Sequence, residues 1–395
     1  MRSLPRAQRA FSAPLIWASK MRQRLLAVIL AGTIFGLLAA PVVAFSQWGF
    51  VLPKPVAAAS YTGPGDVFSG ATQWVGLRSY NAAYATGSNK AIKLRRYSDN
   101  TTQDINILAS GDLDDASALA FGLHSTCTAT AATTTLSISS CSVGSGSIAQ
   151  FDFVIGTGFP VGVSISSVGT CNAPPGTCTL SATSTVSSPV TVNIYSPLYP
   201  VTWYDQTGNG NDLTQATNGN QFQFWLNCLG SFPCVVVDGA FNSSATMSGG
   251  SFSNIAIPYS IEAVEGNRTS STNNTILGKG GATLSFFGAN TVYVASGGAG
   301  INGTETDAAY HVFQGVITSN SVGNMNVDNT ANSGSPGGTT AFGSPDIIGS
   351  GSGGSQYYLF ETGVWPSAPD STHQTSQCHN GYTYWFAPNS VGTSC

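Results

Sequence analysis

Short runs of alternating apolar and polar residues constrain the fold of this chain most. They are rich in β-branched and aromatic side chains and are mostly flanked by Gly, Pro, Asn or Ser, a pattern that predicts strands. Many short strands at such spacing indicate antiparallel sheets packed as a sandwich or barrel, so we expect an all-β fold. The predicted strands are residues 91–95, 190–195, 234–237, 259–264, 291–295, 311–317 and 357–365.

Helix signals are confined to two segments. Residues 69–85 are helix-permissive and carry large apolar residues at helical spacing from Trp74 to Tyr84. Residues 112–121 read as a short helix whose acidic residues lie in its first turn, where they favour the helix dipole. Both segments are therefore predicted to be helical.

Composition narrows the fold class further. Only 8% of the 395 residues are charged, against roughly 25% in an average soluble domain, which excludes a coiled coil or a charged helical bundle. The hydrophobic fraction of 42% and the 46 glycines fit a β-rich globule with many turns rather than a disordered chain.

Charge is unevenly distributed along the chain. Six of the fourteen basic residues precede residue 25, and all eighteen acidic residues follow residue 60. A chain without its first 44 residues would therefore carry an acidic surface. Phosphate binding needs a basic face, so a nucleic-acid partner is not expected.

The N-terminal segment has the pattern of a secretory signal peptide. An uncharged apolar run at residues 25–44 follows a basic stretch that includes Arg22 and Arg24, and it ends in small residues before Ala44. We expect residues 1–44 to be the signal and residues 45–59 a linker; a retained N-terminal anchor helix is the alternative, and Met21 is an alternative start. No second apolar run of this length follows, so we expect no membrane association after cleavage and a location that is secreted or on the exterior of the cell envelope.

Eight cysteines fit an oxidising compartment. They occur as sequence neighbours, which suggests disulfides between them, although eight cysteines allow 105 connectivities. A zinc site at Cys378 and His379, with His373 nearby, is the alternative, but no second cysteine pair accompanies these residues. The suggested pairs are Cys127 with Cys141, Cys171 with Cys178, Cys228 with Cys234, and Cys378 with Cys395.

The segment 122–197 differs from the rest of the chain in composition. Residues 122–197 are rich in Ser, Thr and Val, hold four of the cysteines, and contain Asp152 as their single charged residue. Because several of their segments alternate as strands do, we predict a small all-β module inserted into a sandwich formed by residues 60–121 and 198–395. Unfolded low-complexity sequence is the alternative reading.

The sharpest motif, YDQTGNGNDLTQ, begins at Tyr204. Gly208 and Gly210 permit turns with positive φ, and Asp205 and Asn209 can cap such turns through bonds to backbone N–H groups. The string resembles the YDQSGxGNxLTQ signature of the catalytic domain of α-L-arabinofuranosidase B, glycoside hydrolase family 54. Residues 79–118 resemble the opening stretch of the same family.

This resemblance covers roughly residues 60–120 and 200–370 and is specific in the first two blocks. It implies a concanavalin A-like antiparallel β-sandwich. The same opening motif recurs in non-enzymatic sandwich proteins, so the fold transfers more safely than the activity.

The family's catalytic residues are not matched. Its nucleophilic Glu lies in a strand that corresponds to residues 292–297, which contain no carboxylate, and its acid/base Asp corresponds to Gly353. A vicinal cysteine pair of the family's sugar site is also missing from residues 274–278. A retaining glycosidase needs two carboxyl groups about 5–5.5 Å apart, so the resemblance does not carry the enzyme activity with it.

Other carboxylates are weak substitutes. Glu262 and Glu265 are three positions apart on one strand and are predicted to point to opposite faces. Glu361 could be buried with a raised pKa, but we expect it to face solvent. Asp205 could approach Glu361, but we expect it to have a structural role in its turn.

Three function classes follow. We favour a secreted glycan-binding protein whose partner is a polysaccharide or glycan, and the resemblance implies one that contains arabinose. A hydrolase releasing L-arabinofuranose with relocated carboxylates and a surface or appendage component are the alternatives. Aromatic rings can stack on sugar faces while amides and carboxylates bind hydroxyls. The candidate sugar-binding residues are Trp203, Tyr204, Asp205, Gln206, Asn209 and Asn211, with Trp225 and Trp365 as further aromatic platforms. No cofactor is expected, and a structural Ca²⁺ ion is disfavoured because the sequence has no dense Asp/Asn ligand loop beyond residues 205–212.

Overall fold

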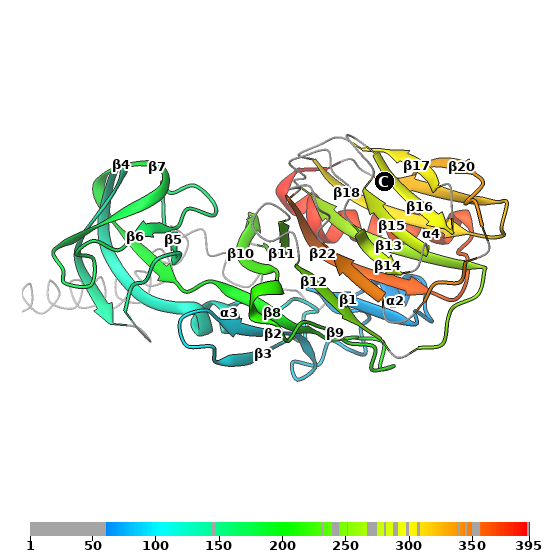
Figure 1. Cartoon of the computed structure of the whole chain (residues 1–395), viewed down its shortest axis with the longest axis horizontal. Helices are drawn as coiled ribbons and strands as arrows, with labels where there is room; N and C mark the ends of the chain where they lie inside the picture. The colour runs from blue at the N-terminus through cyan, green and yellow to red at the C-terminus, as the bar shows by residue number, and fades with distance from the viewer. Residues whose placement is uncertain are drawn as a thin grey trace, which may run out of the picture. The chain divides into compact units, whose positions relative to one another are not determined.

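The computed structural model describes most of the chain after residue 60 (Figure 1). The described ranges are residues 61–143, 147–230, 232–238, 245–250, 252–266, 275–279, 282–286, 291–297, 300–305, 309–338, 340–343, 346–349, 356–392 and 395. The predicted signal peptide and linker, residues 1–59, lie outside them.

Two layers of antiparallel strands form the main body. In the first layer, the central strand β22 (Gln356–Trp365) pairs on one edge with β11 (Phe232–Asp238) and β1 (Gln73–Gly76) and on the other with β13 (Tyr259–Gly266). The layer continues from β13 through three more strands, β18 (Tyr310–Ile317), β19 (Gly323–Val327) and β20 (Thr330–Gly334). On the β11 side it continues through β10 (Gln223–Leu229), β8 (Leu198–Trp203), β2 (Lys90–Arg96) and β3 (Thr102–Asn106).

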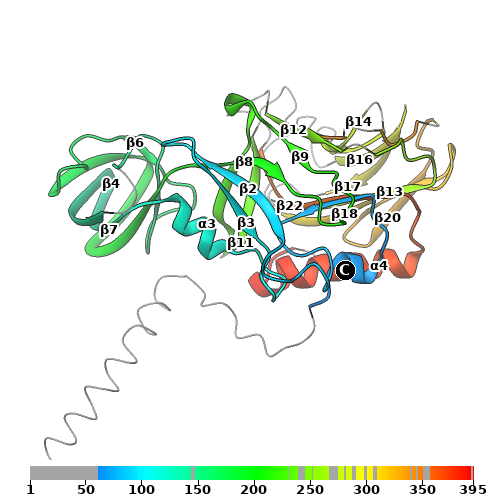
Figure 2. The same ribbon diagram turned by 90° about the horizontal axis from the view of Figure 1, so that it is seen from below.

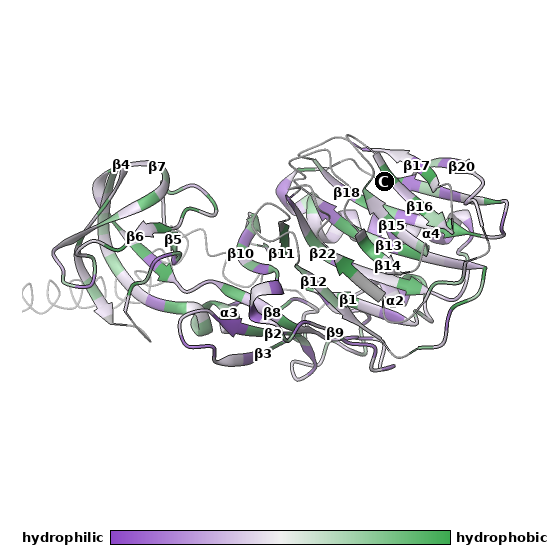
Figure 3. Cartoon of the chain, viewed as in Figure 1, coloured by the Kyte–Doolittle hydropathy of each residue, from purple (hydrophilic) through white to green (hydrophobic). Residues whose placement is uncertain are grey.

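The second layer packs on the first. Its strands pair in the order β9 (Leu213–Thr214), β12 (Thr246–Gly249), β21 (Asp346–Gly349), β14 (Thr275–Lys279), β15 (Ala282–Phe286), β16 (Thr291–Ser296) and β17 (Gly300–Thr304). Phe286 contacts both Tyr357 and Phe313 of the first layer edge to face, at centroid distances of 5.1 and 6.0 Å. The predicted all-β sandwich is therefore confirmed, and apolar residues recur along the strands of both layers (Figure 3).

The helical segments are few. They are α2 (Pro64–Val67), α3 (Asp115–Gly122), α4 (Ser371–Gly381), a π-helical turn at Tyr382–Phe386, and 3-10 turns at Asn218–Asn220 and Ala387–Asn389. Figure 2 shows α4 beside α2 on one side of the strands. Phe360 of β22 packs on Trp385 at 4.9 Å, so the C-terminal helical segment covers the face of the first layer that the second layer leaves open.

One helix prediction is confirmed and the other is wrong. Residues 112–121 correspond to α3, and Asp114 caps it by accepting the backbone N–H of Ser117. Residues 69–85 instead contain strand β1 and a loop. All four residues of β1 are buried and pair with β22, because tertiary pairing with a central strand outweighs the local helical spacing.

The seven predicted strands are present. Within residues 122–197 four strands form a separate sheet, in which β7 (Gly176–Tyr195) pairs antiparallel with β4 (Leu123–Val143), β5 (Phe153–Ile155) and β6 (Ile165–Ser167). This sheet has a hydrophobic core of its own. Phe153 contacts Trp225 of β10 at a centroid distance of 5.8 Å, which joins the insertion to the sandwich.

Four disulfides staple the fold. They pair the sequence neighbours as expected: Cys127–Cys141, Cys171–Cys178, Cys228–Cys234 and Cys378–Cys395. Cys378 is therefore engaged by Cys395 rather than available as a zinc ligand. Within the described part of the chain, no helix is long and apolar enough to cross a bilayer.

Candidate functional site

An open hollow of about 610 Å³ lies beside the turn that carries the 204–215 motif. Three groups of residues line it: the segment just before β1, the motif turn, and two aromatic residues. They are Gly70, Ala71, Thr72, Tyr80, Thr207, Asn209, Asn211 and Phe252. Two of the predicted sugar-binding residues, Asn209 and Asn211, are therefore part of its wall.

Asp205 organises the turn from within. One carboxylate oxygen accepts the backbone N–H groups of Trp74 and Thr207, at 3.1 and 3.0 Å, and the other accepts the N–H of Asn211 at 3.0 Å. The Thr207 hydroxyl also donates to Asp205. The side chain is only 6% exposed, so its oxygens face the protein rather than the hollow.

Replacing Asp205 with Asn is expected to lower the free energy of unfolding by about 2 kcal/mol, because the neutral amide accepts fewer of these bonds and leaves buried N–H groups unpaired. Denaturant unfolding measures the change. Asn218→Ala, an exposed residue outside the hollow, serves as the control, with an expected change within about 0.5 kcal/mol. An Asp205→Asn variant as stable as the control would contradict the bonding role.

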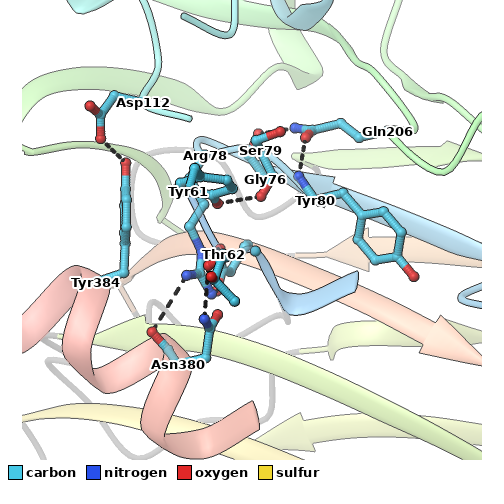
Figure 4. A network of polar contacts seen from close by, with 12 residues as sticks. Tyr61, Thr62, Gly76, Arg78, Ser79, Tyr80, Asp112, Gln206, Asn380 and Tyr384 are labelled. Carbon is cyan, nitrogen blue, oxygen red and sulfur yellow. Dashed lines mark hydrogen bonds and ion pairs between the residues drawn. The ribbon is translucent and has the colours of Figure 1, made fainter. Parts of the chain in front are cut away.

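Gln206 also has a framework role. Its carbonyl oxygen accepts the N–H of Tyr80 at 2.8 Å and its amide donates to the carbonyl of Gly76 at 2.7 Å (Figure 4). It thereby fixes the end of β1 and the segment that follows it against the motif turn. Since Gln206 is 2% exposed, it positions the hollow and does not contact a ligand.

Asn209 and Thr72 each have a side-chain polar atom that could bind a ligand. Asn209 is exposed, and its side-chain amide N–H donates to the carbonyls of Ala71 and Thr72. Among the bonds of the described residues, none uses the Asn209 Oδ1 atom or the Thr72 hydroxyl. The hollow therefore offers one acceptor and one hydroxyl beside the ring of Phe252.

Two of the three predicted tryptophan platforms are buried. Trp203 is fully buried in the core and Trp365 is 1% exposed, so neither ring can stack on a ligand, and the aromatic residues at the hollow are Tyr80 and Phe252. Trp225 is half-buried between Phe153 and Tyr358. Trp203 and Trp365 lie on strands as expected, but their side chains point into the hydrophobic interior.

Tyr204 lies outside the hollow. Its hydroxyl donates to Asp104 at 2.7 Å, and Lys90 lies over its ring at 5.4 Å. Burial and the neighbouring Asp104 carboxylate raise the pKa of the Tyr204 phenol. The residue therefore ties β8 to the β2–β3 hairpin.

Contrary to our prediction, Glu361 does not face solvent. It forms a bidentate ion pair with Arg78, with Nε–Oε2 and Nη2–Oε1 distances of 2.6 Å, and both side chains are fully buried. The reason is that β22 is covered on both faces. The pairing register also skips Phe360, since Val264 lies opposite Glu361 and Glu265 opposite Leu359. This bulge breaks the alternation on which the prediction rested.

Arg78 lies at the centre of a network of polar contacts (Figure 4). It donates to the carbonyl of Asn380 in α4, and it lies 4.8 Å from the ring of Tyr384. The Tyr384 hydroxyl in turn donates to Asp112 at 2.5 Å. Burial disfavours the guanidinium, but the Glu361 carboxylate more than compensates and the pKa of Arg78 is raised.

A second carboxyl group, Glu262, is buried near Glu361. Burial and the charge of Glu361 raise its pKa to about 8, although the amide of Gln314 donates to it at 3.4 Å. A protonated and an ionised carboxyl group together resemble a glycosidase pair in electrostatic terms. Glu262 is 2% exposed and Glu361 is not exposed at all, so no substrate reaches either one.

The positions that correspond to the family's catalytic residues add no carboxylate. Val292 and Val294 of β16 are fully buried in the core. Gly353 lies outside the described residues. Among the residues that line the hollow there is no carboxylate either.

Several contributors were not predicted from sequence. Arg78, Tyr384 and Asn380 come from segments some 300 positions apart, and Phe252 follows a Gly-Ser turn with no strand signal. A lone arginine between the apolar Leu77 and Tyr80 was a detectable sign of a buried cation, because such a charge requires a partner.

Comparison with known proteins supports the fold. No family model and no curated protein matches the sequence. A solved structure of a GH54 α-L-arabinofuranosidase soaked with a cyclic sulfate inhibitor is similar to this chain, with a TM-score of 0.51 at 12% sequence identity over 81% of this chain and 65% of that one. A mutant GH54 α-L-arabinofuranosidase soaked with 4-nitrophenyl α-L-arabinofuranoside gives a TM-score of 0.50 with the same identity and coverage.

The chain thus matches about 65% of the length of those enzymes. At 12% identity the likeness concerns the fold and not family membership. The resemblance stated from the motifs is therefore supported as a shared β-sandwich architecture.

Proposed function

We propose that this protein is a secreted carbohydrate-binding protein without glycosidase activity, and that the hollow beside the motif turn holds the glycan. The observation that carries the proposal is the chemistry of the wall. It combines Asn and Thr side chains with the ring of Phe252 and, among the described residues, contains no carboxylate. Amides and hydroxyls bind sugar hydroxyls, and an aromatic ring offers an apolar surface to a sugar face.

The framework beneath the hollow supports binding rather than chemistry. The side chains of Asp205 and Gln206 form hydrogen bonds with backbone groups of the surrounding segments, and these bonds fix the wall of the hollow in the absence of a ligand. A rigid site lowers the entropic cost of binding. Four disulfides suit an oxidising compartment and accord with the secretion that the N-terminal segment predicts.

The preferred ligand class is a polysaccharide with α-L-arabinofuranosyl side chains. Support comes from the likeness to arabinofuranosidase structures in fold and from the motif that forms part of the hollow. Arabinan and arabinoxylan oligosaccharides are the probes, and galactan and cellulose oligosaccharides are the comparison ligands.

Two substitutions test the hollow by isothermal titration calorimetry with the full chain. Thr72→Val removes a hydroxyl with little change in volume, and Asn209→Ala removes the free acceptor. Each is expected to weaken glycan binding about 3- to 10-fold, the worth of one hydrogen bond. Thr217→Val and Asn218→Ala are matched controls at exposed positions outside the hollow and should bind as the unmodified protein does.

Two results would count against the proposal. Equal affinity of all four variants would place the ligand elsewhere. Release of 4-nitrophenol from 4-nitrophenyl α-L-arabinofuranoside would establish a hydrolase, which requires carboxylates other than those buried at Glu262 and Glu361.

A further inference from the structure

A Ser–His–Asp arrangement lies where the insertion meets the β2–β3 hairpin. His124 Nε2 is 2.9 Å from the hydroxyl oxygen of Ser98, and His124 Nδ1 is 2.8 Å from Asp152 Oδ2. The three residues come from separate segments of the chain. With Nδ1–H donating to the carboxylate, Nε2 is the acceptor for the Ser98 hydroxyl proton, which is the tautomer that a general base needs.

The base and the acid are held rigidly. His124 is 2% exposed and Asp152 is not exposed. Asp152 Oδ2 also accepts the N–H of Ala149 at 2.8 Å. Pairing between β4 and β7 shifts register between Leu123 and Ser125, and such a bulge at His124 re-aims its side chain out of the strand alternation.

The serine, in contrast, is exposed. It lies on the tight turn between β2 and β3, where the N–H of Ser98 donates to the hydroxyl of Ser196 at 3.1 Å and the N–H of Asn100 donates to the carbonyl of Arg96 at 3.0 Å. Asn100 has a φ of 58°, which closes the turn. Ser98 Oγ is therefore fixed toward His124 and open to solvent on its other side.

The backbone N–H next to the serine is a candidate donor for a developing oxyanion. Among the bonds of the described residues, none uses the backbone N–H of Asp99, the residue that follows the serine. In hydrolases with a nucleophile on a sharp turn, this is the amide that stabilises the oxyanion. The Asp99 carboxylate itself is paired with Arg96, at 2.5 Å between Nη2 and Oδ2.

The surroundings indicate the substrate class. Tyr97 and Phe151 adjoin Ser98 and Asp152 in sequence, and they are 44% and 48% exposed. Their rings meet edge to face at 6.3 Å. Two exposed aromatic rings next to a nucleophile offer an apolar surface. They suit a substrate with an apolar acyl or aryl group better than a sugar or a charged peptide.

We propose that Ser98, His124 and Asp152 form an acyl-transfer site that hydrolyses carboxylic esters with a small apolar acyl group. Ser98 Oγ bonds to the carbonyl carbon as its proton passes to His124 Nε2. The bond from that carbon to the alkoxy oxygen then breaks, and His124 returns the proton to the departing alcohol. Water attacks the acyl-Ser98 ester by the same route, which releases the acid and restores the hydroxyl. Asp152 acts as a positioning residue for the imidazole.

A fluorophosphonate probe on the unmodified full chain is the first test, because it labels a serine only when a neighbouring base activates it. Mass spectrometry of the peptides is expected to find one adduct, on Ser98. An unlabelled protein, under conditions that fully label a reference serine hydrolase, overturns the proposal, and so does an adduct on another serine.

Turnover of 4-nitrophenyl acetate and 4-nitrophenyl butyrate is the second test. Ser98→Ala is expected to lower kcat/KM at least 100-fold, and Asp152→Asn to slow labelling of Ser98 by a similar factor while the serine remains in place. Ser88→Ala, an exposed serine on the loop before β2, is the control and should retain full turnover. Equal turnover in Ser98→Ala overturns the proposal.

The outcome is separable from glycan binding. The triad residues do not line the hollow beside the motif turn, so loss of ester hydrolysis in Ser98→Ala should leave glycan affinity unchanged. Should Asp152→Asn fail to fold, labelling of the unmodified chain still decides the question.

Discussion

Replacing Glu361 with Gln is expected to lower the free energy of unfolding by about 3–5 kcal/mol. The substitution leaves the guanidinium of Arg78 fully buried without the counter-charge of Glu361, and it replaces one of the two acceptor oxygens of the bidentate pair with an amide NH₂ group, which cannot accept a hydrogen bond. The remaining partners of Arg78, the carbonyl of Asn380 at 3.4 Å and the ring of Tyr384, do not carry a negative charge. Urea unfolding followed by circular dichroism measures the loss.

A double variant separates the charge from the shape of this site. Arg78→Met with Glu361→Leu removes both charges together, and replacing a buried ion pair by apolar residues of similar volume is neutral or stabilising in many proteins. We therefore expect the double variant to recover most of the loss of Glu361→Gln. Lys90→Gln, which breaks the exposed pair with Asp104, is the control, with a cost below about 1 kcal/mol. A Glu361→Gln variant that matches this control would contradict the role of the buried pair.

Local patterns were sufficient for the seven predicted strands because each of them carries its own signal. The segments around β13, β18 and β22 alternate, contain β-branched and aromatic residues, and end at turn residues, so neighbours in sequence decide them. The motif turn was equally accessible, since Gly208 and Gly210 do adopt positive φ, at 86° and 74°. Both properties reside in a few consecutive residues.

Environment, by contrast, depends on residues far away in sequence. The burial of Glu361 requires Arg78 from one end of the chain and the helical segment around Asn380 from the other. The bulge at Phe360 arises from pairing with β13 and has no local signature. For the same reason Trp203, which directly precedes the motif, was predicted to be a surface platform, whereas the structure places it in the hydrophobic core.

The Ser98 arrangement illustrates the same limit. Ser98, His124 and Asp152 have no common sequence motif, and the histidine is redirected by a bulge between β4 and β7. Their proximity follows from how the insertion joins the sandwich. A search of the sequence for spaced catalytic motifs therefore cannot find it.

The stability of the protein is expected to fall as the pH rises from about 5 to 8, because of Glu262. Its pKa in the folded state is raised to about 8 from an ordinary value of 4.5, by burial and by the charge of Glu361. Between these two values the folded protein holds a proton that the unfolded chain has released. The folded state therefore binds more protons, and the free energy of unfolding decreases with rising pH by at most about 1.4 kcal/mol per pH unit from this group.

Glu262→Gln isolates this contribution, since the amide stays neutral at every pH and keeps an oxygen near the donor of Gln314. Urea unfolding at pH 5, 6.5 and 8 should give a shallower decline for the variant, with the largest gain over the unmodified protein at pH 8. In Glu361→Gln the like charge that raises the pKa of Glu262 is absent, so the decline should still begin near the ordinary pKa of 4.5 but end at a lower pH. Identical pH slopes for the unmodified protein and Glu262→Gln would contradict this prediction. They would show that Glu262 ionises in the folded state as it does in the unfolded chain, and that water reaches its carboxyl group.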